Sequence, residues 1–241
     1  MNSAITRFDC QAIIFDLDGT LIDSTEAIKR IWSQWGAHHG INHPDLLRVA
    51  VSMRTIEAVR LLAPHLDVDI ETEYLESAEA TELEEVTEVE GAGILLRSLP
   101  QGNWGIVTSI TRRTAQAKLN HLDLPIPSVL VTADDVECGK PAPDGYLLAA
   151  ECLRVAANRC VVIEDTPAGI QAGLAAGMTV IGLAMTYPVD QIQHATAIVA
   201  HLNDITVSVQ DTEGEESMLK LFIPILPGIL SFSTPRGSFG C

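Results

Sequence analysis

The sequence contains few basic residues and few aromatic ones. Its 241 residues include 15 Lys and Arg against 32 Asp and Glu, which gives a formal net charge of −17. A polyanion would be repelled on average, so this balance argues against nucleic acid or an acidic membrane surface as a main partner. Aromatic residues make up 5% of the chain and apolar residues 47%. Such a mainly aliphatic content favours an α/β architecture with buried parallel strands over an antiparallel sandwich.

The sequence also lacks closely spaced cysteine pairs and long apolar runs. The five cysteines are an odd number without Cys-x-x-Cys spacing. They support neither a zinc site nor a disulfide framework, and a reducing compartment explains them most simply. No segment near the N-terminus has the composition of a signal peptide. The most apolar late segment, 218–230, is short and contains two prolines, so we expect no membrane span. These absences predict a cytoplasmic protein.

Strand and helix patterns alternate over much of the chain and predict a parallel sheet. The first strand is expected at 12–15, a continuous apolar run that is typical of burial on both faces. Further strands are expected at 104–108, 129–132, 160–163 and 179–182. Helices are expected around them at 91–99, 112–122, 143–153 and 168–176. Strands separated by single helices imply right-handed crossovers, so the predicted fold class is α/β with a parallel sheet.

The interval after the first strand looks entirely helical. Apolar residues recur at helical spacing over 25–39, and further helices are expected at 44–51, 54–63 and 69–85. No strand-like stretch interrupts this interval. The predicted division is a core of residues 1–23 and 91–205, a helical insertion of 24–90, and a tail of 206–241. The tail has no clear periodicity and stays unassigned.

Two carboxylates follow the first predicted strand, in Asp16-Leu17-Asp18-Gly19-Thr20. Carboxylates at positions i and i+2 repel each other unless a cation or a proton lies between them. One of them could attack an electrophile while the other transfers protons. An Asp-Gly turn is common in soluble proteins, but the full segment directly after an apolar strand favours a functional site.

Thr108, Ser109 and Lys140 are candidates for binding phosphate. The hydroxyls of Thr108 and Ser109 follow the strand at 104–108 and could donate hydrogen bonds to phosphoryl oxygens. Pro141 restricts Lys140 to an extended conformation, and an ammonium there could offset carboxylate and phosphate charge. Taken alone, helix capping would explain Thr108 and Ser109, and a surface position would explain Lys140.

Glu164 and Asp165 follow the strand at 160–163. They could cap the next helix, or they could help to bind a hard cation. Magnesium takes one or two carboxylates together with substrate phosphate and water, and Asp16, Asp18 and Asp165 are suited to this. Because ligands bind beyond the carboxyl ends of parallel strands, these polar groups are expected to meet at one edge of the sheet.

The four segments together resemble the haloacid dehalogenase superfamily. The matching residues are 15–24, 106–109, 139–141 and 162–169. The resemblance implies a Rossmann-like core with an α-helical cap inserted after the first strand, in agreement with the helical interval. Around these motifs the chain is similar to bacterial sugar-phosphate phosphatases and to glycerol- and 2-deoxyglucose-phosphate phosphatases.

The resemblance also implies a magnesium-dependent mechanism on a small phosphate monoester, such as a sugar or polyol phosphate. Asp16 is expected to attack phosphorus and form an aspartyl-phosphate, and Asp18 to protonate the leaving alcohol and later deprotonate water. The expected Mg²⁺ ligands are Asp16, the backbone carbonyl of Asp18 and Asp165, with Glu164 in support. The expected phosphate-binding residues are Thr108, Ser109 and Lys140.

The cap segment departs from the family pattern. Many relatives have His-Gly-Arg or His-Gly-Lys in the substrate loop of the cap, where this chain has Ser52-Met53-Arg54. Arg54 could still contact an anionic or hydroxylated substrate, and Arg112 and Arg113 are further candidates. The cap therefore leaves the identity of the phosphate ester open, and the sequence gives no indication of an oligomeric state.

Other activities of the superfamily remain as alternatives. A phosphomutase of the β-phosphoglucomutase type would use the same motifs but return the phosphoryl group to a sugar. A non-catalytic regulator on the same fold would be expected to have degenerate motifs, whereas the acidic positions here are intact. A dehalogenase would lack the second carboxylate, Asp18, and a phosphonate hydrolase would need a cap lysine, for which the insertion offers only Lys29.

Overall fold

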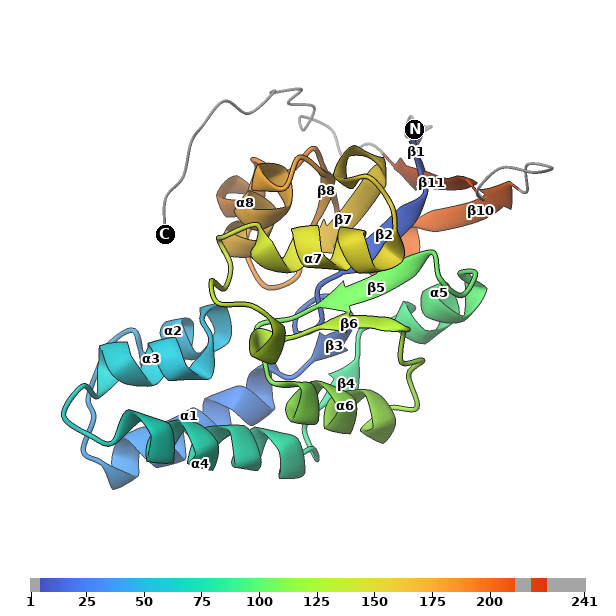
Figure 1. The fold of residues 1–241 in the computed structure, drawn as a ribbon. Helices are drawn as coiled ribbons and strands as arrows, with labels where there is room; N and C mark the ends of the chain where they lie inside the picture. The colour runs from blue at the N-terminus through green and yellow to red at the C-terminus, as the bar shows by residue number, and fades with distance from the viewer. Residues whose placement is uncertain (1–4, 211–217, 225–241) are drawn as a thin grey trace.

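The computed structural model describes residues 5–210 and 218–224, and its centre is a six-stranded sheet (Figure 1). The strands are β2 (Ala12–Phe15), β5 (Trp104–Val107), β6 (Val129–Val131), β7 (Cys160–Glu164), β8 (Thr179–Leu183) and β9 (Ala197–Val199). Their order is β6-β5-β2-β7-β8-β9, and every neighbouring pair is parallel. The predicted α/β class with a Rossmann-like parallel sheet is confirmed. The five predicted strands are present, and β9 is an addition.

Helices cover both faces of this sheet. On one face lie α7 (Asp144–Leu153), α8 (Pro167–Ala175) and α9 (Val189–Ile192), and on the other lie α5 (Ala92–Ser98) and α6 (Arg112–His121). Successive residues of a strand point to opposite faces, so Ile13 and Phe15 of β2 pack into one apolar cluster and Ile14 into the other. Burial on both faces explains why these strands are continuous apolar runs.

Four helices form a third apolar cluster beside the sheet (Figure 1). They are α1 (Thr25–His38), α2 (Leu46–Ser52), α3 (Thr55–Leu62) and α4 (Val68–Thr81). The cluster includes Trp32 and Trp35 of α1, whose rings meet edge to face with centroids 5.4 Å apart. This cluster gives the helical interval an apolar core of its own, which is what an inserted domain requires.

A short strand corrects the prediction that residues 24–90 are free of strands. Strand β4 (Thr87–Glu88) pairs antiparallel with β3 (Ile22–Asp23), where the chain leaves and re-enters the sheet-bearing part. In addition, α4 ends at Thr81, before the predicted end at 85. Two-residue strands are too short to produce a periodic pattern, and the glutamates that follow Thr81 favour a helix by composition alone.

A second sheet involves both ends of the described chain. Strands β1 (Ile5–Cys10), β11 (Met218–Pro224) and β10 (Thr206–Gln210) pair antiparallel in the order β1-β11-β10. In β11 the buried Leu219, Leu221 and Ile223 alternate with half-buried residues. The half-buried positions include the apolar Met218 and Phe222, so the sequence of β11 does not alternate between apolar and polar residues. For this reason the strand could not be predicted in the tail. Its segments 211–217 and 225–241 lie outside the described residues.

Three of the cysteines, Cys10, Cys152 and Cys160, are free thiols, and Cys10 and Cys160 are buried. Over residues 5–210 and 218–224, none of the helices combines the length and the apolar character that crossing a membrane would need.

Candidate active site

The candidate site lies at the carboxyl ends of β2, β5 and β7. Asp16 comes directly after β2, and its backbone N–H donates to the carbonyl oxygen of Ile163 in β7 over 3.0 Å. Lys140 reaches the same place from the loop before α7: its ammonium pairs with Asp16 and donates to Glu164 Oε1 over 2.7 Å. The convergence expected from parallel strand ends is thus present for these residues.

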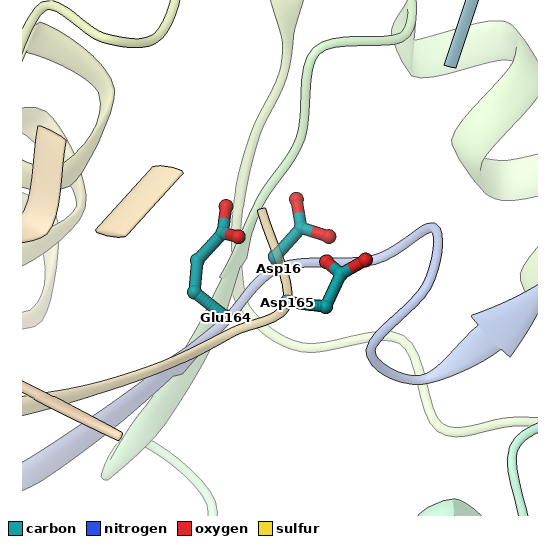
Figure 2. Close-up of side chains that lie close together, drawn as sticks. All are labelled: Asp16, Glu164 and Asp165. Carbon is teal, nitrogen blue, oxygen red and sulfur yellow. The ribbon is translucent and has the colours of Figure 1, made fainter. Parts of the chain in front are cut away.

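Asp16, Glu164 and Asp165 form a buried acidic cluster (Figure 2). One carboxylate oxygen from each lies within 4.8 Å of the others. Asp165 Oδ1 accepts a hydrogen bond from Thr20 over 3.2 Å, whereas Oδ2 is buried and has no hydrogen-bond partner. A buried carboxylate oxygen without a partner is costly in an apolar setting and fits a cation ligand. Among the described residues, this is the one cluster of its kind.

Glu164 differs from its two neighbours because protein donors occupy both of its oxygens. Oε1 accepts from Lys140 and from the Tyr146 hydroxyl, and Oε2 accepts from the backbone N–H and the hydroxyl of Thr166. These bonds fix the side chain against the start of α8. The arrangement suits a residue that supports the site and holds Lys140, rather than a direct ligand.

Burial and neighbouring carboxylates raise the pKa of two of these groups, Asp16 and Asp165. Burial raises the pKa of Asp16 well above its usual value, the Lys140 ammonium opposes this, and Glu164 and Asp165 add to it. Burial and then Glu164 raise the pKa of Asp165 to about 7, although the neighbouring Thr186, Lys140 and Thr20 lower it. Carboxylates in this position resist being ionised together unless a positive charge joins them, as a divalent cation would.

Gly19 allows the first loop to approach Asp165. Its φ is +92°, in the left-handed region, and a Cβ at this position would lie 2.1 Å from Asp165 Oδ2. The neighbouring turn is tight, with the carbonyl oxygen of Leu17 accepting from the N–H groups of Leu21 and Ile22 over 2.9 and 3.0 Å. Any side chain here would have to displace the Asp165 carboxylate. Glycine is therefore needed both for the left-handed backbone and for the close approach.

Asp18 is held by two donors on one oxygen. Its Oδ1 accepts from the Ser24 hydroxyl over 2.5 Å and from the Lys118 ammonium over 2.7 Å. Its Oδ2 is buried and has no partner among the described residues. The free oxygen remains available to a proton or a ligand, while the other is fixed in place.

Sequence reasoning missed Lys118, which is 1% exposed. It lies on the buried face of α6 with Thr114, Ala115 and Leu119. A lysine on the apolar face of an amphipathic helix is unusual, because a buried ammonium needs a partner. That pattern was available in the sequence, but the partner Asp18 lies 100 positions away.

A cavity of about 50 Å³ adjoins the acidic residues. Asp16, Asp18 and Lys140 line it, together with Thr108 and Ser109, the residues directly after β5. Thr108 is fixed there by its backbone N–H, which donates to Val131 in β6 over 2.9 Å. The structure therefore brings all three predicted phosphate-binding residues to the same cavity as the two aspartates.

The helical part supplies the opposite wall of the cavity. Its contribution includes Ser52, Met53, Thr55 and Glu79. Arg54 is absent from this wall: its guanidinium pairs with Glu57 and donates to the Val136 carbonyl oxygen over 3.4 Å. Arg112 and Arg113 are also elsewhere and pair with Asp135 over 2.7 Å and with Glu73 over 2.9 Å, respectively. These three arginines are thus engaged with protein groups.

Comparison with known sequences decides the family. Residues 13–183 match the haloacid dehalogenase-like hydrolases. This chain belongs to that family. It is 40% identical over 206 residues to hexitol phosphatase A of Escherichia coli K12, covering 83% of this chain and 95% of that protein. It is 35% identical over 223 residues to glycerol-1-phosphate phosphohydrolase 2 of Saccharomyces cerevisiae, covering 85% and 88%.

Solved structures agree with the fold of this haloacid dehalogenase-like hydrolase. A family IA, variant 3 hydrolase from Entamoeba histolytica superposes with a TM-score of 0.69 at 27% identity, covering 81% of this chain and 95% of that one. CbbY from Rhodobacter sphaeroides, solved in complex with phosphate, gives a TM-score of 0.70 at 22% identity, covering 80% and 94%. At that identity the second likeness concerns the fold alone.

Proposed function

We propose that this chain is a magnesium-dependent phosphatase that hydrolyses a sugar or polyol phosphate through an aspartyl-phosphate on Asp16. The chain is a phosphoric monoester hydrolase of the haloacid dehalogenase-like family. The observation that supports the proposed metal and intermediate most is the convergence of Asp16, Asp165 and Lys140 beside Asp18. The names of the two relatives, which refer to hexitol and glycerol phosphates, support the substrate class.

Asp16 and Asp165 would hold the Mg²⁺, together with the backbone carbonyl of Asp18. The buried, unpartnered Oδ2 of Asp165 supports this assignment. When bound, the cation supplies positive charge that reduces repulsion between nucleophile and phosphate and stabilises the transferring phosphoryl group. Glu164 would support the site through Lys140, to which it is hydrogen-bonded.

The reaction would proceed in two steps. First, a carboxylate oxygen of Asp16 attacks phosphorus, the bond to the alcohol oxygen breaks, and Asp18 donates a proton to that oxygen. Then Asp18 takes a proton from water, the water oxygen attacks phosphorus, and inorganic phosphate leaves as Asp16 is freed. The arrangement of Asp18 supports this role, since Oδ1 is held by Ser24 and Lys118 while Oδ2 is without a partner.

Thr108, Ser109 and Lys140 would bind the phosphoryl oxygens, and residues 24–90 would act as a cap on the core of 1–23 and 91–205. The cavity of about 50 Å³ is much smaller than the roughly 300–1,000 Å³ of typical small-molecule pockets. Substrate entry would therefore require the cap to open. The β3–β4 pair is the natural hinge, because both chain connections pass through it. In an opened cap, Arg54 would lose its bond to the Val136 carbonyl oxygen in the core, while its pairing with Glu57 lies within the cap.

Phosphate release tests the proposal. The parent protein and Asp16→Asn are incubated with sorbitol 6-phosphate, glycerol 1-phosphate and 2-deoxyglucose 6-phosphate, with Mg²⁺ and with EDTA. We expect release by the parent with Mg²⁺, none in EDTA, and a loss of at least about 10³-fold for Asp16→Asn. Activity that survives the substitution would contradict the role of Asp16. An isomerised sugar phosphate in place of inorganic phosphate would indicate a mutase.

A further inference from the structure

Glu79 is the one carboxylate that the helical part contributes to the lining of the active-site cavity. It lies in α4 and is 6% exposed, although glutamate is seldom buried without a partner. Its Oε1 accepts a hydrogen bond from the indole N–H of the fully buried Trp32 over 2.9 Å. This bond crosses from α4 to α1 and fixes the carboxylate toward the cavity.

Trp32 uses only part of the hydrogen-bonding capacity of Glu79. A carboxylate has about four lone-pair sites on its two oxygens. Of the cavity-lining residues in the helical part, Ile28, Ala50 and Val51 offer no side-chain donor, and the Ser52 hydroxyl donates to the Arg48 carbonyl oxygen. Burial raises the pKa of Glu79, while the Lys118 ammonium and the Trp32 bond lower it. In either protonation state the remaining lone pairs can accept hydrogen bonds from a ligand.

The position of Glu79 relative to Asp18 identifies the part of the substrate that it would meet. Asp16 and Lys140 belong to the end of the cavity where the phosphoryl group would lie. Lys118 binds Asp18 and also interacts electrostatically with Glu79, so it connects the two acidic groups. Asp18 is the group that would protonate the leaving oxygen. Glu79 lines the same cavity from the helical part and has Asp18 and Lys118 among its charged neighbours, which assigns it to the side of the leaving alcohol.

We infer that Glu79 is a specificity-determining residue that accepts hydrogen bonds from hydroxyl groups of an uncharged polyol or sugar leaving group. This inference rests on the proposed phosphatase activity and adds the residue that selects the alcohol. A leaving group with its own carboxylate would place two acidic groups together and would be disfavoured. One without hydroxyls would leave the buried carboxylate unsatisfied.

The test compares Glu79→Gln with the parent on three substrates: sorbitol 6-phosphate, 4-nitrophenyl phosphate and phosphoglycolate. Glutamine keeps the length of the side chain and an acceptor for Trp32 but removes the charge. We expect kcat/KM for sorbitol 6-phosphate to fall roughly 10- to 100-fold, the size expected for a hydrogen bond to a charged group. The value for 4-nitrophenyl phosphate should change less than about threefold, within ordinary context variation. A ratio of two substrates is independent of the fraction of folded enzyme.

Glu76→Gln is the matched control, because Glu76 lies one turn earlier in α4 and does not line the cavity. It should leave the substrate ratio unchanged. Equal losses on sorbitol 6-phosphate and 4-nitrophenyl phosphate would overturn the inference while leaving the phosphatase activity standing, as would a parent preference for phosphoglycolate. Activity that survives Asp16→Asn, or no phosphate release by the parent, would instead remove the proposed function and the inference with it.

Discussion

The ammonium of Lys118 lies 2.7 Å from Oδ1 of Asp18, in a place where Lys118 is 1% exposed. The pair joins helix α6 to the loop after β2. Opposite charges attract strongly in such a setting, but each also loses its hydration. The result is a fixed orientation for Asp18 and a high cost for removing either partner alone.

Replacing Lys118 by Met should impair both stability and activity. Methionine fills a similar volume but leaves the Asp18 carboxylate with Ser24 as its one remaining side-chain donor among the described residues. Breaking a buried pair by removing one partner costs about 3–5 kcal/mol, and the 20% exposure of the Asp18 side chain places the expected loss toward about 3 kcal/mol. Urea denaturation measures the loss, and the phosphate-release assay should show a lower kcat.

Lys29→Met is the control for this prediction. Lys29 pairs with Glu26 over 2.8 Å, but their side chains are 44% and 70% exposed. Exposed pairs contribute at most about 1 kcal/mol, so stability should hardly change. If the two lysine variants lost the same stability, the Lys118–Asp18 pair would not have the structural role described.

Gly19→Ala should damage the acidic site more than backbone strain alone explains. Its φ of +92° disfavours any side chain, and the added Cβ would lie 2.1 Å from Asp165 Oδ2. Gly102 provides the matched control, since its φ is +89° and a Cβ there would meet nothing within 4 Å. Gly102→Ala should therefore cost only the left-handed strain, about 1–2 kcal/mol.

The two alanine variants are compared by thermal unfolding with and without Mg²⁺. Gly19→Ala should unfold at the lower temperature and lose most of the stabilisation that Mg²⁺ gives the parent, whereas Gly102→Ala should keep it. Equal responses to Mg²⁺ in both variants would show that the close approach of Gly19 to Asp165 is unimportant for the metal.

Much of this site could be predicted from the sequence because its residues follow apolar runs directly. Asp16, Thr108 and Glu164 stand at or just after the ends of β2, β5 and β7, and parallel strand ends converge by geometry alone. Lys118 and Glu79 lie in the middle of helices, where position along the chain does not reveal the partner. A charged residue on the apolar face of a helix indicates a buried partner, but which residue is the partner depends on how α4 and α6 pack.

The fold shows the same limit. Continuous apolar runs predicted five strands of the parallel sheet, because burial on both faces excludes polar residues. Strand β11 was missed since its half-buried face is also partly apolar, and β10 is largely exposed. The pairing of β11 with β1 joins segments more than 200 residues apart, and β10 pairs with β11. Such contacts are specified by tertiary packing, which a local pattern does not contain.

The effect of Asp165→Asn on stability should change sign when Mg²⁺ is added: the variant should be the more stable protein without metal and the less stable one with it. Without metal, the folded-state pKa of Asp165 is raised to about 7, so its contribution to stability is full below its unfolded value near 3.8 and is lost as pH rises through 7. At pH 8 in EDTA, the asparagine variant should therefore unfold at a higher temperature than the parent, and the difference should vanish near pH 4.

Added Mg²⁺ should stabilise the parent and not Asp165→Asn, because the variant lacks the unpartnered carboxylate oxygen. The Mg²⁺ concentration for half-maximal activity should rise by more than about tenfold, the smallest effect expected when even a supporting group of a metal site is changed. Thermal unfolding against Mg²⁺ concentration measures both effects. Equal Mg²⁺ responses of parent and variant would exclude Asp165 as a ligand.

Glu76→Gln should stabilise the protein at high pH and not at low pH. Burial first, and then Asp134, Glu79 and Glu73, raise the pKa of Glu76 to about 7, while Arg113 opposes them. A raised folded-state pKa means that the contribution of Glu76 to stability is full below its ordinary pKa of 4.5 and is lost as pH rises through about 7. Thermal unfolding at pH 4 and at pH 8 should therefore give a higher midpoint for the variant at pH 8 and similar midpoints at pH 4.

Glu84→Gln, at an exposed position after α4, is the control and should lack this pH dependence. If Glu76→Gln raised the unfolding midpoint by the same amount at both pH values, the charge of Glu76 near the other acidic groups would not be the cause.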